Sequence, residues 1–191
     1  MSDISDAEIH QIVHRVVGEA LGSSRPVTTS NVPASQPVIS TKKVVAIGAD
    51  HGGFELKEAL KPELKTLGFE ISDVGTNSKD AVDYPDFAHA VAQAVGTGKA
   101  WRGIMIDGAG IGSCIVANKV PGVRAGMACD YSSAVNSREH NDTNVLTLGA
   151  GLIGVNLAKQ IVKTWLTTEF AGGRHTSRID KIKSVEKKYL K

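Results

Sequence analysis

The sequence predicts an α/β protein with a doubly wound, Rossmann-like sheet of five parallel strands and helices on both faces. From residue 43 onward, short apolar runs alternate with segments of helical spacing, which is typical of strand–helix–strand units. The central apolar run, residues 104–106, is followed at once by a glycine-rich turn, a common connection between a buried strand and a helix. The 191 residues are 41% hydrophobic, which suffices for one such domain and an appendage.

The predicted strands are apolar runs that end in polar or glycine-containing turns, and they cover residues 43–48, 69–74, 104–106, 123–129 and 145–148. The predicted helices follow these runs and cover residues 56–67, 85–95, 113–118, 131–140, 155–170 and 177–189. Pro62 lies inside the first helix, where we expect a kink or a break. The helix at 155–170 is expected to turn Leu157, Ile161, Trp165 and Leu166 inward, and the last helix carries Ile179, Ile182, Val185 and Tyr189.

The bulk composition argues against several classes of partner. A net charge of +2 gives no electrostatic footprint for nucleic acid or a membrane surface. No apolar run approaches the roughly 20 residues of a membrane span. The two cysteines, Cys114 and Cys129, provide no disulfide framework, which suits a reducing compartment. We therefore expect a cytoplasmic protein.

The N-terminal part divides into an amphipathic helix at residues 1–22 and a flexible Ser/Thr/Pro linker at residues 23–42, ahead of the main domain at 43–191. Ser5 and Glu8 form a capping box, and Gly22 is placed to end the helix. Acidic residues near the start exclude a secretory or mitochondrial leader. His10 and His14 could share a metal ion, but solvated side chains are the favoured interpretation.

A helix of this length needs a partner for its apolar stripe, and a long tether is an unusual way to pack it on its own domain. Residues 1–22 resemble the encapsulation peptides that carry enzymes into bacterial microcompartments. That resemblance implies docking to shell proteins in the microcompartment lumen. The alternative is a helix that packs against the protein's own oligomer.

The central turn combines a carboxylate, Asp107, with three glycines at 108, 110 and 112. Glycines allow sharp turns and close approach of a ligand to the main chain, and free N–H groups at the start of a helix can hold an anion or oxyanion. Asp107 adds a candidate proton carrier. The spacing does not fit the dinucleotide pattern G-x-G-x-x-G, and the alternative is a plain tight turn.

Further polar segments are expected at the carboxyl ends of the strands, where ligands bind in doubly wound sheets. They are Asp50-His51, residues 137–144, and residues 172–178 with Arg174, His175 and Arg178. Guanidinium groups near a helix start would suit a phosphate. Each group also has a purely structural alternative: an Asp can cap a turn, His140 can cap its own helix, and Arg174 can pair with an acid. We expect these groups to converge on one edge of the sheet.

Five motifs together resemble ribose-5-phosphate isomerase type B, a family that also includes galactose-6-phosphate isomerase subunits. The resemblance covers about residues 43–190. The motifs are Asp50-His51-Gly-Gly-Phe54, Asp83-Tyr84-Pro85, Gly110-Ile-Gly112 with Ala117-Asn118-Lys119, His140-Asn-Asp-Thr-Asn144, and Gly-Gly-Arg174-His175-x-x-Arg178.

The resemblance implies a metal-free and cofactor-free aldose–ketose isomerisation of a phosphosugar through a cis-enediolate, with ribose 5-phosphate to ribulose 5-phosphate as the default reaction. It also implies a site between the two subunits of a homodimer, and leaves a tetramer open. The implied roles are ring opening by Asp50 and His140, hydroxyl positioning by Asn141, oxyanion binding by the N–H groups of Gly108, Gly110, Ile111 and Gly112, and phosphate binding by His51, Arg174, His175 and Arg178.

The chain departs from the family pattern at four places. Asp107 stands where many members carry the cysteine that shuttles the proton, and Ser113 stands where others carry a glutamate base. Ala109 replaces a usual threonine, and Gly151 replaces a usual phosphate-binding arginine. A desolvated carboxylate can abstract a proton next to a carbonyl, so Asp107 is the predicted base and Cys114 the rival. The alternative function is an altered or inactive family member that binds a sugar phosphate or serves as an adaptor.

Overall fold

The computed structural model describes residues 43–190, and the predictions for residues 1–22 and 23–42 lie outside this range. Five parallel strands form one sheet in the order β2-β1-β3-β5-β4, which confirms the predicted fold class. The strands are β1 (Val44–Ala49), β2 (Glu70–Asp73), β3 (Arg102–Asp107), β4 (Ala125–Met127) and β5 (Val145–Gly149).

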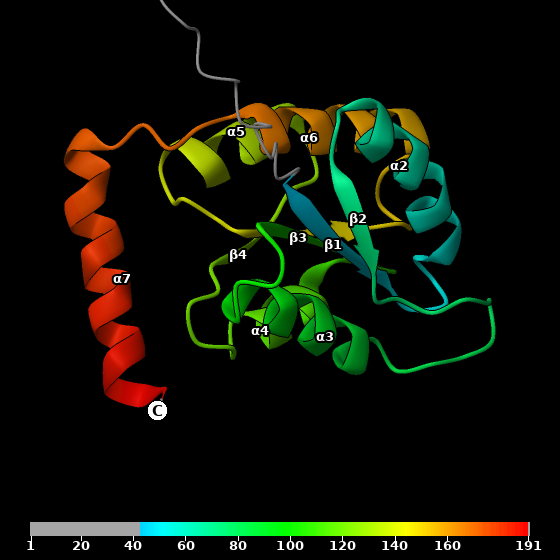
Figure 1. Cartoon of the computed structure of the whole chain (residues 1–191), viewed down its shortest axis with the longest axis horizontal. Coiled ribbons are helices and arrows are strands. Elements are labelled where there is room, and N and C mark those ends of the chain that lie inside the picture. The colour runs from blue at the N-terminus through cyan, green and yellow to red at the C-terminus, as the bar shows by residue number, and fades with distance from the viewer. Residues whose placement is uncertain (1–42, 191) are drawn as a thin grey trace, which may run out of the picture. The chain divides into compact units, whose positions relative to one another are not determined.

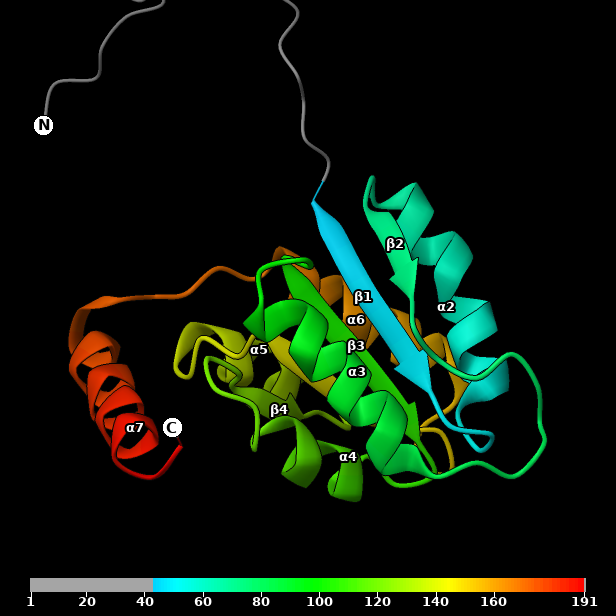
Figure 2. The same ribbon diagram turned by 60° about the horizontal axis from the view of Figure 1, so that its bottom comes forward.

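Helices cover both faces of the sheet. α2, α5 and α6 lie on one face, and α3 and α4 lie on the other (Figures 1 and 2). The helices are α2 (Phe54–Thr66), α3 (Tyr84–Gly96), α4 (Ile111–Ala117), α5 (Tyr131–Glu139), α6 (Val155–Thr167) and α7 (Thr176–Tyr189), with a 3₁₀ turn at Gly173–His175 before α7.

Two apolar cores follow from the strand and helix patterns. On the first face, Leu56, Leu60 and Leu64 of α2 recur at helical spacing and are buried against the sheet together with Trp165 of α6. On the other face, Val91 of α3 and its neighbours pack on the alternate side chains of the same strands. Residues buried on both faces explain why the central strands are almost continuously apolar.

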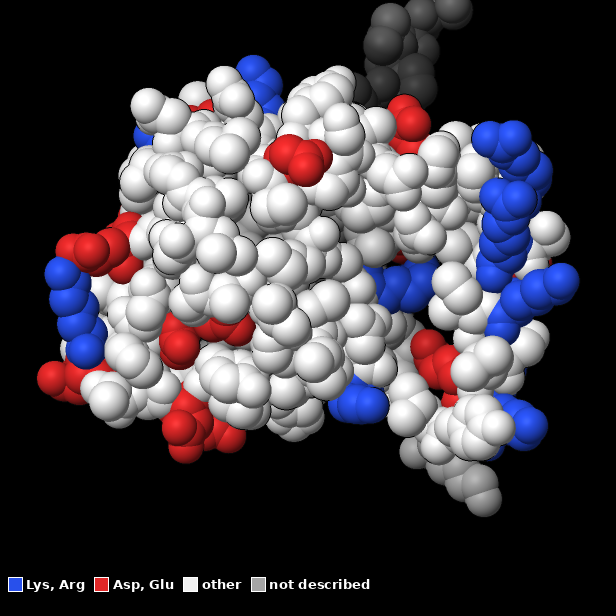
Figure 3. All heavy atoms as spheres, turned by 180° about the vertical axis from the view of Figure 1, so that it is seen from behind, with Lys and Arg blue, Asp and Glu red and all other residues white. Residues whose placement is uncertain are grey.

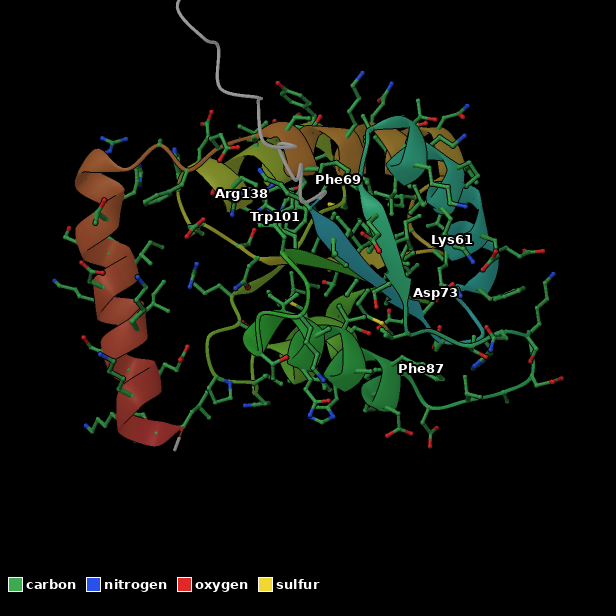
Figure 4. All side chains as sticks on the ribbon, viewed as in Figure 1. Lys61, Phe69, Asp73, Phe87, Trp101 and Arg138 are labelled. Carbon is green, nitrogen blue, oxygen red and sulfur yellow. The ribbon has the colours of Figure 1, made fainter. Side chains whose placement is uncertain are left out.

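Polar contacts fix the outer elements onto this core. Lys57 is completely buried in α2, and its ammonium group lies 2.8 Å from the Asp73 carboxylate of β2, which also pairs with Lys61 at 2.8 Å (Figure 4). The buried Arg102 guanidinium donates to the carbonyls of Trp165 and Leu166 at the end of α6. Burial lowers the pKa of Arg102 to about 10, so the group stays charged.

Of the kink or break expected at Pro62, the break is wrong, because α2 runs through this residue. Proline has no N–H, so the Glu58 carbonyl lacks its usual helical hydrogen bond. Pro62 is exposed and Glu58 is half-exposed, so solvent can reach this carbonyl. Leu60 and Leu64 are buried on either side of Pro62 and hold the helix on the sheet. Packing therefore outweighs the lost hydrogen bond.

Two smaller expectations, the length of the fourth strand and the inward direction of Leu157, also differ from the structure. The fourth strand is only Ala125–Met127, because Arg124 gives its N–H to the Asn144 side chain rather than to a neighbouring strand. Leu157 of α6 is 37% exposed and does not face inward. Of the apolar residues on α7 only Ile179 is buried. Figures 1 and 2 show α7 standing beside the sheet rather than covering it.

The strand order creates a topological switch between β1 and β3. These strands are adjacent, but β1 continues into α2 on one face and β3 continues into α4 on the other. The connections therefore diverge and leave a crevice at the carboxyl ends of β1 and β3, where doubly wound proteins bind ligands. We refer to this side of the sheet as the carboxyl edge and to the opposite side as the amino edge. Among the described residues, no helix is both long enough and apolar enough to span a membrane.

Candidate active site

Asp50 and Asp107 flank the switch point, since Asp50 directly follows β1 and Asp107 ends β3. Both carboxylates are buried, with 7% and 5% of the residue exposed. Asp50 accepts a hydrogen bond of 3.0 Å from the Gly53 N–H and so caps its own turn. Gly53 is required here because a Cβ atom would lie 2.3 Å from the Ile106 carbonyl oxygen. The β1 turn is thereby pressed against the end of β3.

His51 lies beside Asp50 but is exposed. Its Nδ1 atom is 3.1 Å from the Val82 carbonyl oxygen and 3.2 Å from the Val82 nitrogen, so either tautomer can form one hydrogen bond to this residue. The contact joins the β1 turn to the long loop that precedes α3. The opposite ring nitrogen of His51 has no partner within the described part of the chain, and it is available to a ligand.

The Asp107 carboxylate is folded back into the glycine-rich loop. One oxygen, Oδ1, accepts the N–H groups of Ala109 at 2.8 Å and of Gly110. The other, Oδ2, accepts the Ser113 N–H at 3.2 Å and the Ser113 hydroxyl. Gly110 has a φ of 77°, a conformation that favours glycine and turns its N–H onto the carboxylate. Two of the loop N–H groups therefore already hold an anion supplied by the chain itself.

This arrangement changes which N–H groups a ligand could use. The Gly110 N–H, which we expected to bind a developing oxyanion, is engaged by Asp107. The N–H groups of Gly108, Ile111 and Gly112 have no hydrogen-bond acceptor among the described residues. These three remain the candidate oxyanion donors of the loop.

Two neighbouring segments enclose the loop. The Tyr84 ring at the start of α3 lies directly against Gly112, where a Cβ atom would come within 2.6 Å of the ring. On the other side, the chain after β5 pairs with the loop through hydrogen bonds from Ala150 to Asp107 and from Gly151 to Gly108, at 2.8 and 3.0 Å. A side chain at 149 would collide with the Ala109 backbone at 2.7 Å. The loop is therefore packed on both sides.

The rival base, Cys114, points away from this crevice. Its sulfur lies 3.5 Å from the Ala125 carbonyl oxygen of β4 and 3.6 Å from the side-chain nitrogen of Asn118. The thiol is thus directed toward strand β4 and not toward Asp107. This geometry favours Asp107 over Cys114 as the proton carrier of the carboxyl edge.

The expected convergence on one edge is wrong for residues 137–144 and 172–178, which lie at the amino edge. Residues 140–144 connect the end of α5 to the start of β5, and a helix that returns between parallel strands ends where the next strand begins. Val145 pairs with Gly103 at the start of β3, whereas Asp107 pairs with Gly149 at its end. The six residues of β3, at about 3.3 Å each, separate the two edges by roughly 16 Å.

The amino-edge residues form a second cluster of their own. The rings of His140 and His175 stack with centroids 4.2 Å apart and planes inclined by 7°. His140 also caps α5 with its backbone and lies 2.8 Å from the Asn136 side chain, which Asn141 contacts as well. Asn141, Arg174 and Arg178 are exposed. The stack brings residues 140 and 175 together although 35 positions separate them.

This second cluster is cationic. Within residues 43–190, neither Arg174 nor Arg178 forms an ion pair with an acidic side chain. Burial lowers the pKa of His175, and the charges of His140, Arg174 and Arg178 lower it further. An anion bound here would relieve this repulsion. Figure 3 shows Lys and Arg side chains gathered along the edge of the molecule where α7 lies.

The turn that carries His140 and Asn141 is held by Asp142. This residue has a positive φ of 44°, and its carboxylate pairs with Arg124 at 2.7 Å and with Arg138 at 2.9 Å. The buried Arg138, labelled in Figure 4, also donates to the carbonyl of Thr143. We predicted no role from the sequence for these residues or for Ser113 and Tyr84. The spacing of Arg138 and Asp142, at i and i+4, is the sequence signal that could have revealed this anchor.

A doubly wound sheet with two buried carboxylates and a glycine-rich loop at its switch point is the arrangement of an α/β enzyme. Among the described residues no group of three or more His, Cys, Asp or Glu side chains is placed to hold a metal ion. The profile of the family described as Ribose/Galactose Isomerase matches residues 45–182.

Individual relatives agree with this match. The ribose-5-phosphate isomerase B of Escherichia coli (strain K12) is 44% identical over 146 residues, which cover 76% of this chain and 98% of that protein. The D-erythrulose-4-phosphate isomerase of Pectobacterium atrosepticum is 42% identical over 139 residues, covering 72% of this chain and 91% of that protein. The solved structure of Clostridium thermocellum ribose-5-phosphate isomerase B has a TM-score of 0.75 at 51% identity, covering 76% of this chain and 99% of that chain.

The chain belongs to the ribose/galactose isomerase family, and it is an aldose–ketose isomerase of the ribose-5-phosphate isomerase B type. The family match begins at residue 45, so the N-terminal stretch lies outside it.

Proposed function

We propose that the protein interconverts ribose 5-phosphate and ribulose 5-phosphate through an enediolate, with Asp107 as the base. The observation that carries this proposal is a buried carboxylate at the switch point, beside a loop that still offers three free N–H groups. The similarity to proteins named ribose-5-phosphate isomerase B supports the choice of substrate. One of the relatives is named for a four-carbon sugar phosphate, so the sugar is the part of the proposal that most needs testing.

In the proposed reaction, Asp50 and His140 open the sugar ring, and Asn141 positions the hydroxyl groups. Asp107 removes the proton from C2 of the aldose and returns it to C1 of the ketose. The N–H groups of Gly108, Ile111 and Gly112 stabilise the oxyanion that develops between the two steps. His51, Arg174, His175 and Arg178 bind the phosphate, for which forked guanidinium donors are well suited.

These roles are divided between the two edges of the sheet, so we propose that one active site is assembled from two copies of the chain. About 16 Å between the edges is more than a five-carbon sugar phosphate can span. The carboxyl edge of one copy would therefore face the amino edge of the other.

The amino edge has the features of a surface that a second copy covers. Ile182, Val185 and Tyr189 of α7 are 45%, 60% and 69% exposed. A cavity of about 600 Å³ lies between Ile182 and the unpaired edge strand β4. Exposed apolar side chains next to a strand at the lateral border of a sheet, as β4 is here, are typical of an interface. A homodimer is the smallest assembly that satisfies this proposal, and a tetramer remains compatible with it.

The direct test is turnover by the purified full-length protein. Ribulose 5-phosphate formation from ribose 5-phosphate should be measured next to four-carbon and six-carbon aldose phosphates under the same conditions. We expect the highest kcat/KM with the pentose phosphate. A higher value with another sugar would change the substrate, and no turnover with any of them would contradict the proposed activity.

A second candidate function is a sugar-phosphate-binding protein without turnover. The observation that favours it is that all four acceptor positions of Asp107 are filled by the chain's own donors. The family resemblance also implies a threonine and a phosphate-binding arginine at positions where this chain has Ala109 and Gly151. Calorimetry with ribose 5-phosphate separates the two candidates, because binding without product supports the second and measurable product eliminates it.

We further propose that residues 1–22 dock the enzyme to microcompartment shell proteins, so that it acts in the microcompartment lumen. The support is the amphipathic pattern on a long polar linker, in a stretch that the family match does not cover. A fluorescent protein fused to residues 1–41 should collect in shells in cells that make them. A diffuse signal, or loss of turnover on deletion of residues 1–22, would contradict this proposal.

A further inference from the structure

Ser113 is completely buried in the first turns of α4, and both of its donors point at one atom. Its N–H lies 3.2 Å from Oδ2 of Asp107, and its hydroxyl donates to the same oxygen. Because no part of Ser113 is exposed, we infer that it acts without touching the substrate. Any effect on the reaction must pass through Asp107.

The hydrogen bonds of Asp107 leave no acceptor position open. A carboxylate offers about two positions on each oxygen. Ala109 and Gly110 occupy both on Oδ1, and Ser113 occupies both on Oδ2. A base must accept a proton in each turnover, so one of these four donors has to give way.

Only one of the four donors can give way without moving the backbone. The three N–H groups are fixed by the loop and by α4, which are packed between Tyr84 and the chain after β5. The Ser113 hydroxyl is different, because it can rotate and because its oxygen both donates and accepts. It can donate to the carboxylate before proton transfer and accept from the carboxylic acid afterwards.

We propose that Ser113 is the positioning residue that directs the proton to Oδ2 of Asp107, an assignment that rests on the proposed isomerase function. When the C2–H bond of the aldose breaks, its electron pair enters the enediolate and its proton bonds to Oδ2. The new O–H then donates to the Ser113 oxygen, whose own hydrogen turns away. The proton returns from Oδ2 to C1, and the original hydrogen bond re-forms.

This role predicts a specific kinetic pattern. Ser113→Ala removes the hydroxyl and leaves the N–H donor and the phosphate-binding residues in place. We expect kcat to fall by about 10- to 100-fold, as for the loss of a hydrogen bond to a charged group, while KM stays within about twofold. The rate at which the substrate C2 hydrogen exchanges with deuterated water should fall in parallel with kcat.

A matched pair of variants isolates the hydroxyl from the packing. Ser113→Thr and Ser113→Val have nearly the same shape and differ in the oxygen alone. We expect the Thr variant to recover most of the kcat lost in Ser113→Ala and the Val variant to recover none. Thr147→Val is the control, since the Thr147 hydroxyl is also fully buried but has no hydrogen-bond partner among the described residues, and its removal should leave kcat unchanged.

The outcomes separate this inference from the function on which it rests. If the wild-type protein forms no ketose phosphate, the proposed function fails. If the wild type is active and folded Ser113→Ala keeps its kcat and exchange rate, the role of Ser113 is overturned and Asp107 can still be the base. Equal activity of the Thr and Val variants would overturn it as well, and this comparison remains decisive if Ser113→Ala does not fold.

Discussion

The two edges of the sheet are built in opposite ways. At the carboxyl edge, Asp50 and Asp107 are buried, and each is bound by donors from its own turn. At the amino edge, Arg174 and Arg178 are exposed and lack an acidic partner in the described region, and apolar side chains of α7 face outward. The carboxylates of the carboxyl edge are hydrogen-bonded within a single chain. The amino edge instead exposes positive charge and apolar surface that are available to another molecule.

Under the proposed residue roles, this difference divides the work of an isomerase between the two edges. A base has to be held accurately, and the β–α turns at the switch point supply rigid N–H donors for that purpose. A phosphate site needs unpaired positive charge, which a chain cannot satisfy internally without losing its function.

The largest effect is expected at the carboxyl edge. Asp107→Asn replaces an acceptor-only group with one that cannot take the proton, so kcat should fall by about 10²- to 10⁴-fold. The matched variant is Cys114→Ser, which changes the rival base on the same segment and should retain near-normal kcat. Steady-state assays of ketose phosphate formation measure both. Loss of activity in Cys114→Ser together with full activity in Asp107→Asn would reverse the assignment.

A change at the amino edge should weaken substrate binding more than chemistry. Arg174→Ala removes one guanidinium from the cationic cluster, and we expect KM to rise by about 10- to 100-fold with a smaller change in kcat. Lys181→Ala is the control, because it removes an exposed positive charge from α7 without touching the cluster. An unchanged KM in Arg174→Ala would remove this residue from the phosphate site.

Removing either of two buried hydroxyl groups in the core beneath both edges should have a smaller effect, and the two changes in stability should differ in sign. Thr143 accepts a hydrogen bond of 2.9 Å from the Trp165 indole, whereas the Thr147 hydroxyl has no partner within residues 43–190. Thr143→Val should lower the free energy of unfolding by about 1–3 kcal/mol, and Thr147→Val should leave it unchanged or raise it by up to about 1 kcal/mol. Denaturant titration measures both, and equal effects would contradict the hydrogen-bond assignment.

The smallest expected effect concerns pH and the amino edge. The pKa of His175 is lowered from 6.5 in the folded chain, so the unfolded chain binds the proton more readily. Neutral His175 therefore contributes to the stability of the folded chain above about pH 6.5. This contribution is lost as the pH falls through the lowered folded-state pKa. His175→Gln cannot take up this proton, so its melting temperature should fall less than that of the wild type between pH 7.5 and 5.5. Parallel curves would show that His175 is not the group involved.

The fold was predictable because each strand and helix carries its own pattern. Leu56, Leu60 and Leu64 mark one helix face, and residues 104–106 mark a buried strand. The break at Pro62 was wrong because a local rule ignores how firmly neighbouring leucines pack. The apolar stripe of α7 was visible in the sequence, but a stripe does not say which surface covers it.

The site was only partly predictable. The residues at the ends of β1 and β3 were correctly placed at the carboxyl edge, because strand ends follow from strand positions. Residues 140–144 were placed at the wrong edge, although a segment between a helix and the next strand belongs at the amino edge. The contact between Asp107 and Ser113 could not be predicted, because it depends on the exact turn of the intervening glycines.

The most direct test of the account is complementation between two impaired variants, one altered at each edge, assayed at a ribose 5-phosphate concentration well below the wild-type KM, where both variants are nearly inactive. Asp107→Asn and Arg174→Ala should be mixed in equal amounts, unfolded together and refolded. If each site joins the carboxyl edge of one copy to the amino edge of the other, half of the dimers are mixed and each mixed dimer has one intact site, so about a quarter of wild-type activity should return. No recovery above that of the separate variants, in samples shown to contain mixed dimers, would contradict a site shared between two chains.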